Sequence, residues 1–279
     1  MLSLGLGIVA ALAWGVHDLC VRYVSQNAGI IAPLLGVMVF GTLMVAPFSL
    51  LAEPQPTTGA VTLGLVAGVI YGLAGYALYQ AFSIGPVRLV APIIGSYPAL
   101  SVAWAGVTGQ AATLDQWVAV LLIIVGVGFG VGRSDEDGQP QGRRRAAVLW
   151  SLAAGVSFAT TFAIGQAAAS GGAEVALLLP TRLAALGTII ALAVLIGQSV
   201  RPGKKTLPVL VLMGALDALA LGMIIVAGGV PRPEFASVAA SAFGLITVTL
   251  AALFLRERMT PAQWGAVGVV FASIAYLGL

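Results

Sequence analysis

Five ionisable residues lie inside stretches of sequence that are otherwise strongly apolar. The segment AWGVHDLCVRYV (residues 13–24) carries His17, Asp18 and Arg22, and two later apolar stretches carry Arg182 and Asp217. His17 is the only histidine in the chain. An imidazole beside a carboxylate can bind or transfer a proton. An arginine fork can receive the carboxylate of a small solute, and an aspartate can receive its amine.

The composition indicates the solvent around these groups. Hydrophobic residues make up 59% of the chain and charged residues 8%, whereas an ordinary soluble domain is about 25% charged. The mean hydropathy is +1.04. Such a chain cannot cover its exterior with polar groups, so we expect an integral membrane protein in contact with lipid.

Ten apolar runs follow one another, each near the roughly 20 residues that a helix needs to cross the hydrocarbon core. Inside a bilayer the backbone must satisfy its own hydrogen bonds, so these runs predict ten transmembrane helices in an all-α fold. The runs occupy about 2–24, 30–51, 60–83, 86–107, 114–132, 146–169, 174–197, 206–228, 234–254 and 260–279.

The two halves of the chain resemble each other at an offset of 147 positions, which pairs TLDQWVAV (113–120) with TPAQWGAV (260–267). In both copies Thr precedes Gln by three residues, which predicts a capping box at a helix start. The same offset pairs Pro33 with Pro180, Gly75 with Gly222 and Pro86 with Pro233. We therefore predict a five-helix repeat over 1–132, a linker over 133–145 and a second repeat over 146–279. Five is odd, so the second repeat is expected to be inverted in the membrane.

The basic residues predict the orientation. Eleven of the thirteen lysines and arginines lie in or near alternate connections, and only Arg182 and Arg232 lie elsewhere. Because the basic side is normally cytoplasmic, we expect a multi-pass protein of the cell (inner) membrane with a cytoplasmic linker and both termini outside. Equivalent loops differ as inversion requires: AEPQPTTG (52–59) has no basic residue, whereas RPGKK (201–205) has three.

The segment PEFASVAASAFGLITVTLAALFLRERMTPAQWGAVGVVFASIAYLG (233–278) resembles the last two spans of an EamA-type member of the drug/metabolite transporter superfamily. The shared features are a proline opening the ninth run, the turn Arg256-Glu257-Arg258, and Gln-Trp-Gly opening the tenth. Gln110 stands where the second half has Glu257. The resemblance implies ten helices as two inverted five-helix repeats around a central cavity, and transport, often export, of small metabolites such as amino acids.

Charged and polar groups inside the apolar runs are candidates for substrate binding, because a charge at mid-membrane costs about 2.5–3.5 kcal/mol. Trp14, Asp18 and Arg22 share one helical face, and Arg182 and Asp217 lie on consecutive runs at depths that differ by about 4–5 Å. The predicted substrate-binding residues are Trp14, His17, Asp18, Tyr71, Tyr76, Gln166, Arg182 and Asp217.

Six of these eight residues also have a structural interpretation. Asp18 could pair with Arg22, and His17 could bond to a backbone carbonyl. Arg182 and Asp217 could form a salt bridge that only locks two helices. Gln166 could make a helix–helix hydrogen bond, and Tyr76 could serve packing.

These features favour a secondary transporter that exports a small metabolite, such as an amino acid or a related zwitterionic or weakly charged solute, by alternating access. Protons are a candidate coupling ion, and a monomer or homodimer is left open. Two alternatives are a membrane scaffold or sensor subunit and an enzyme that uses His17 and Asp18 as an acid–base pair. The sequence lacks zinc-ligand spacing, Gly-x-Ser-x-Gly and a phosphate-binding loop. We therefore expect no enzyme activity, no cofactor, no metal and no nucleic-acid partner.

Overall fold

The computed structural model describes residues 2–100, 113–133, 141–198, 203–256 and 259–277, and throughout these ranges the regular structure is helical, with no strand. Seven helices are long and apolar enough to cross a membrane. They are α1 (Leu2–Ala28), α2 (Ile31–Leu51), α3 (Thr58–Ile84), α7 (Gln141–Ala169), α8 (Leu178–Ile196), α9 (Leu207–Val226) and the continuous run of α10 (Glu234–Ala240), α11 (Phe243–Leu250) and η4 (Ala251–Leu255). The expected all-α membrane fold is thereby confirmed.

Three further helices complete the described part of the bundle: α4 (Val87–Gly95), α6 (Leu114–Arg133) and α12 (Pro261–Leu277). Short turns η2 (Lys204–Thr206) and η3 (Ala227–Gly229) flank α9. These helices overlap the ten predicted apolar runs, although α7 begins at Gln141, inside the predicted linker 133–145. The end of the run 86–107, most of the linker 133–145, and residues Gln110, Glu257 and Arg258 of the family motifs lie outside the described residues. That all ten runs cross the membrane stays a prediction.

Local chemistry explains several helix ends. The Thr57 hydroxyl accepts a hydrogen bond from the Ala60 amide at 3.2 Å at the start of α3. Before α12, the Thr260 amide donates to Gln263 Oε1 at 2.9 Å, and the Gln263 amide donates to Thr260 Oγ1 at 3.2 Å, which is the reciprocal pattern of a capping box. The end of α8 is closed by Gly197 at φ +67°, a left-handed conformation that glycine adopts without steric cost.

The fourth helical run of each half is interrupted. In the first half α4 stops at Gly95, and the chain resumes a helical turn after Ser96. In the second half α10 and α11 are separated at Ser241 and Ala242. The two interruptions face each other, because a Cβ atom placed on Gly95 would lie 3.1 Å from the Ser241 carbonyl oxygen.

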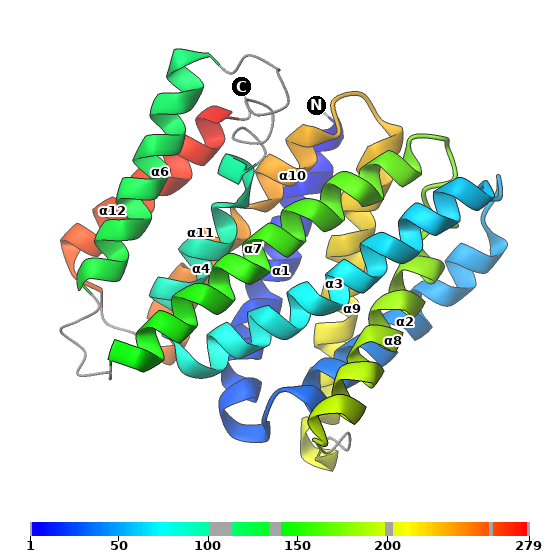
Figure 1. Cartoon of the computed structure of the whole chain (residues 1–279), viewed down its shortest axis with the longest axis horizontal. Coiled ribbons are helices and arrows are strands. Elements are labelled where there is room, and N and C mark those ends of the chain that lie inside the picture. The colour runs from blue at the N-terminus through cyan, green and yellow to red at the C-terminus, as the bar shows by residue number, and fades with distance from the viewer. Residues whose placement is uncertain (1, 101–112, 134–140, 199–202, 257–258, 278–279) are drawn as a thin grey trace.

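Contacts between the two halves are symmetrical: where a helix of the first half contacts a helix of the second, the equivalent helices contact each other with the halves swapped (Figure 1). Helix α3 contacts α7 and α8 of the other half, and α9 contacts α1 and α2 in the same way. Likewise α4 contacts α7, while α10 and α11 contact α1; α6 pairs with α12. Figure 1 shows the start of α1 and the end of α12 at the same end of the molecule. The core therefore lies between the halves rather than within each.

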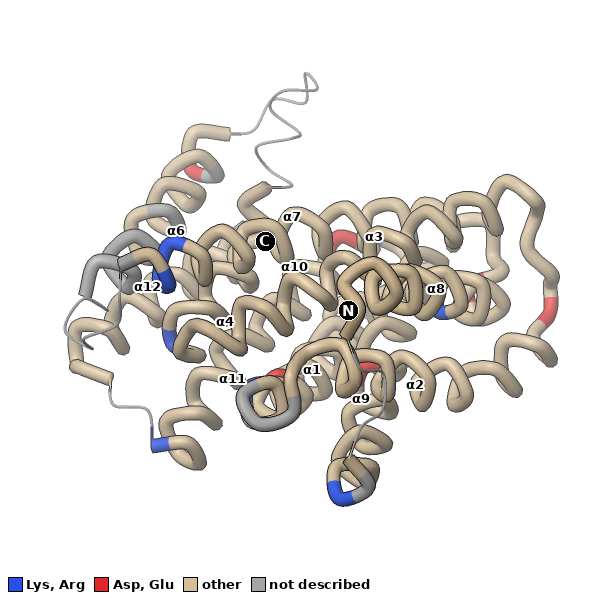
Figure 2. Tube along the Cα trace, turned by 60° about the horizontal axis from the view of Figure 1, so that its bottom comes forward, with Lys and Arg blue, Asp and Glu red and all other residues tan. Residues whose placement is uncertain are grey.

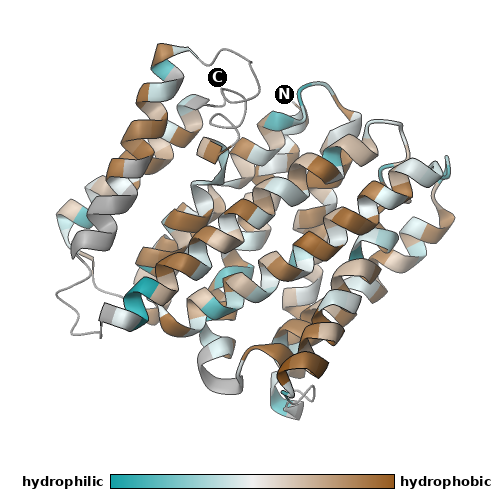
Figure 3. Cartoon of the chain, viewed as in Figure 1, coloured by the Kyte–Doolittle hydropathy of each residue, from teal (hydrophilic) through white to brown (hydrophobic). Residues whose placement is uncertain are grey.

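The exterior is apolar, as contact with lipid requires. Figure 3 shows hydrophobic residues along the outer faces of the helices, and Figure 2 shows few charged residues along their length. Leu51, Leu195 and Phe254 are 84%, 81% and 71% exposed. The hydrocarbon tails of the surrounding lipid explain why apolar side chains cover so much of the surface.

Glycines allow the closest helix approach between the halves. A Cβ atom on Gly68 of α3 would overlap the Thr181 carbonyl oxygen of α8 and would lie 2.8 Å from Ala184 Cβ. The equivalent contact of α9 with α2 depends on Gly214, where a Cβ atom would lie 2.9 Å from the Gly41 amide nitrogen. Small residues bring membrane helices together because dispersion forces act only at close range.

We expect Gly68→Ala to lower the free energy of unfolding by about 1–3 kcal/mol, because the added methyl group meets backbone atoms that cannot move aside. Gly187→Ala, on α8, is the matched control, since nothing lies within 4 Å of its added Cβ atom. Thermal unfolding in detergent measures both variants. Equal melting temperatures for the two would contradict the proposed packing.

Candidate functional site

A pocket lies at the centre of the bundle, between helices of both halves. Its wall consists of Trp14, His17, Asp18, Leu34, Val37, Met38, Tyr71, Gly75, Leu78, Tyr79, Tyr97, Phe158, Phe162, Asp217 and Phe243. Residues from α1, α2, α3 and the turn after α4 form one part of the wall, and residues from α7, α9 and α11 form the other. Five of the eight predicted substrate-binding residues lie on it: Trp14, His17, Asp18, Tyr71 and Asp217.

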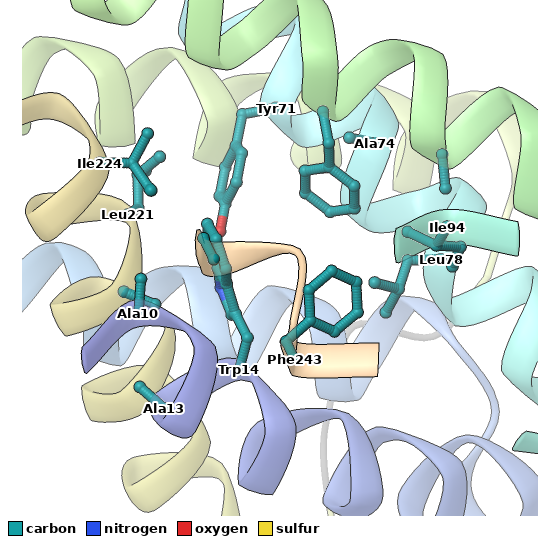
Figure 4. Close-up of a cluster of buried hydrophobic side chains, with 14 of the residues drawn as sticks. Ala10, Ala13, Trp14, Tyr71, Ala74, Leu78, Ile94, Leu221, Ile224 and Phe243 are labelled. Atoms are coloured by element: carbon teal, nitrogen blue, oxygen red, sulfur yellow. The ribbon is translucent and has the colours of Figure 1, made fainter. Parts of the chain in front are cut away.

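Asp217 of α9 is the most heavily bonded polar group at the pocket. Its Oδ2 atom accepts a hydrogen bond from Arg182 Nη1 of α8 at 2.6 Å. Its Oδ1 atom accepts from the Tyr71 hydroxyl of α3, and from Trp14 Nε1 of α1 at 3.4 Å. One carboxylate thus joins four helices. Figure 4 shows the Tyr71 and Trp14 rings reaching toward each other from opposite sides.

Arg182 lies behind Asp217 and is not part of the pocket wall. Its side chain is 1% exposed, and its Nε and Nη2 atoms have no hydrogen-bond partner among the described residues. Gly41 of α2 faces the guanidinium so closely that a Cβ atom there would overlap Nη2. The contact observed is therefore the salt bridge between consecutive spans, which was one of the two interpretations of this pair.

His17 and Asp18 form a second polar group on the wall. His17 Nδ1 lies 2.9 Å from Asp18 Oδ1. His17 Nε2, Asp18 Oδ2 and the Tyr79 hydroxyl are buried and have no hydrogen-bond partner within the described part of the chain. Arg22, the alternative partner for Asp18, donates to the carbonyl oxygen of Phe82 near the end of α3.

Tyr76 and Gln166 lie away from the pocket wall. Tyr76 is five positions from Tyr71, which turns it about 140° around the helix. Its hydroxyl accepts a hydrogen bond from Gln80 Nε2 at 2.8 Å, and its ring meets the ring of Trp150 edge-on. Gln166 Nε2 donates to the Pro233 carbonyl oxygen at 3.1 Å, so the structure shows the helix–helix bond that was its alternative interpretation.

Sequence reasoning missed most of the aromatic wall. Trp14 stacks on Phe162 with ring centroids 5.4 Å apart, and Phe162 stacks on Phe158 at 5.8 Å. Tyr97 meets Phe162 edge-on. The spacing of Phe158 and Phe162, i and i+4, was a usable signal of one helix face. The placement of Tyr97 and Phe243 was not, because it depends on how interrupted helices pack.

The pocket is almost filled in this conformation. The space open to the centre of a water molecule is about 20 Å³, and a single water needs about 10–15 Å³ on this measure. A solute the size of an amino acid does not fit unless the helices separate. Among the described residues the wall has two carboxylates and one imidazole, and no Lys or Arg. In the described residues no group of three or more His, Cys, Asp and Glu side chains could hold a metal ion.

A helical membrane bundle with a buried pocket between its halves has the features of a membrane transporter. Residues 1–131 match the model of the EamA-like transporter family, which belongs to the drug/metabolite transporter superfamily. The predicted resemblance is confirmed, although the segment 233–278 that carried its motifs lies outside the match. A crystal structure described only as that of a protein aligns with 98% of this chain and 95% of its own, with a TM-score of 0.70 at 14% identity, and shows the same fold. No curated protein matches the sequence.

We expect Arg182→Ala to lower the free energy of unfolding by about 3–5 kcal/mol, because Asp217 then stays buried without its counter-charge. Replacing both partners, as Arg182→Met with Asp217→Leu, should recover much of that loss, because no unpaired charge remains. Arg232→Ala is the control: it breaks an ion pair whose side chains are about 60% exposed, and such pairs contribute about 0–1 kcal/mol. Thermal or chemical unfolding in detergent compares the variants.

An Arg182→Ala protein as stable as the unmodified protein would show that the ion pair between Arg182 and Asp217 has no structural role. If the double variant regains stability but loses flux, the charges act in transport as well as in packing.

Proposed function

We propose that the protein is a secondary transporter that exports a small metabolite, such as an amino acid or a related zwitterionic or weakly charged solute, across the cell (inner) membrane. The observation that carries the proposal is the central pocket, to which both halves contribute wall residues. Movement of one half against the other would open such a pocket first to one side and then to the other, which is alternating access. The match of residues 1–131 to the EamA-like transporter family supports a membrane transporter of this superfamily.

Two inverted five-helix repeats, over 1–132 and 146–279, are part of the same proposal. The symmetrical helix contacts between the two halves support it, as does the interruption of the fourth helical run in both halves. Broken helices at corresponding positions of two repeats often mark a transport site, because they bring backbone polar groups to the membrane midplane. We also propose that the basic linker over 133–145 is cytoplasmic and that both termini lie outside.

Solute flux tests the transport proposal. The purified protein, reconstituted in liposomes loaded with labelled amino acids, should release at least one of them faster than empty liposomes do. Gly75→Phe should abolish release, because a Cβ atom on Gly75 already lies 3.3 Å from Leu34 and a phenyl ring would fill the pocket. Gly187→Phe, where the added atoms meet open space, should retain it.

Release that continues in Gly75→Phe would place the pathway elsewhere. Should no solute in a broad panel move, the scaffold or sensor alternative would be favoured instead.

Cysteine labelling tests the inversion. In a Cys20→Ser background, Gln55→Cys and Gly203→Cys place one exposed thiol in each of two equivalent loops, between the second and third runs of each half. A membrane-impermeant maleimide added to intact cells should label the cysteine at 55, and the cysteine at 203 should react only after the membrane is opened. Labelling of both positions from the same side would contradict inverted repeats.

A further inference from the structure

Three buried polar atoms on the pocket wall have no hydrogen-bond partner in the described part of the chain: Asp18 Oδ2, His17 Nε2 and the Tyr79 hydroxyl oxygen. Asp18 and Tyr79 are each 1% exposed, and His17 is 4% exposed. Buried polar groups are almost always hydrogen-bonded in folded proteins. A concentration of exceptions at one cavity therefore indicates that something else bonds to them when the site is occupied.

The two carboxylates of the pocket differ in how their charge is balanced. Asp217 has the guanidinium of Arg182 at 2.6 Å and further hydrogen bonds from Tyr71 and Trp14. Within the described residues Asp18 has one hydrogen-bond contact, to the imidazole of His17, and its second oxygen has no partner. No Lys or Arg of these residues lies on the wall beside it. In a medium of low dielectric constant, a carboxylate that faces no guanidinium or ammonium group strongly favours a cation beside it.

The rest of the wall suits an organic cation better than an inorganic one. Aromatic rings surround the polar atoms, with Trp14, Phe158 and Phe162 in mutual contact. The faces of such rings attract cations, by about 2 kcal/mol or more where water is excluded, and they also cover the apolar part of a ligand. A bare metal ion would require several oxygen ligands, and of the two carboxylates on the wall Asp217 is already bonded to Arg182.

We infer that the pocket recognises a protonated amine that carries an apolar or aromatic body, with Asp18 as its counter-charge. This inference rests on the proposed transport function and narrows its substrate class. The ammonium group donates to Asp18 Oδ2, and the aromatic wall holds the carbon skeleton. A carboxylate on the solute is not required, because Arg182 is bonded to Asp217 and sits behind it.

Four probes of nearly equal size and different charge test the inference: phenethylamine, phenethyl alcohol, 3-phenylpropionate and phenylalanine. Calorimetric titration of the full chain in detergent should show phenethylamine binding at least tenfold more tightly than the alcohol, with 3-phenylpropionate weakest. Asp18→Asn should weaken amine binding at least tenfold and leave alcohol binding unchanged. Asp115→Asn is the matched control, because this exposed aspartate lies on α6, outside the pocket wall.

Binding and flux give separable outcomes. An amine that binds no more tightly than the alcohol overturns the inference, and this ranking needs no variant, so a misfolded Asp18→Asn protein does not spoil the test. Unchanged amine affinity in a folded Asp18→Asn protein overturns it too. If phenethylamine binds as expected but liposomes that contain the protein release none of the four probes faster than protein-free liposomes do, the transport proposal fails for this substrate class and the assigned amine site stands.

Discussion

A carboxylate buried in a bundle that lipid surrounds is the constraint on which the rest of the structure depends. Asp217 is 3% exposed in the middle of an apolar helix, and an isolated charge there would cost far more than a folded protein can spare. The chain satisfies it with donors from three other helices: Arg182 of α8, Tyr71 of α3 and Trp14 of α1. Those helices are thereby drawn to α9, and a polar cluster forms at the centre of the bundle.

The glycines follow from the same constraint. Arg182 can reach Asp217 because Gly41 of α2 has no side chain where the guanidinium lies. Close approach of α3 to α8 at Gly68, and of α9 to α2 at Gly214, sets the positions of the helices that supply the bonds. Because these glycines have no side chains, the helices pack closely enough for Arg182 to reach Asp217 and balance its charge. Asp18, on the same pocket wall, has no such guanidinium among the described residues, and this difference gives the pocket its expected preference for cations.

Much of this arrangement could be predicted from the sequence, because lipid imposes simple rules. Apolar runs about as long as a membrane span predicted the helices. Thr260 and Gln263 predicted a helix start, which the structure shows as a capping box. Five of the eight proposed binding residues lie on one pocket. Tyr76 and Gln166 lie elsewhere because depth along a helix says nothing of which way a side chain points. The bonds between Tyr71, Trp14 and Asp217 join residues up to 203 positions apart, and no local pattern encodes such contacts.

Transport by alternating access requires the pocket between the halves to open to each side of the membrane in turn. Met38→Cys in a Cys20→Ser background places one thiol on the pocket wall. Its reaction with a small membrane-impermeant thiol reagent can be measured separately from each side of sealed vesicles of known orientation. Alternating access predicts reaction from both sides, slowed by a transported solute. A thiol that reacts from neither side, in a folded protein, would contradict it.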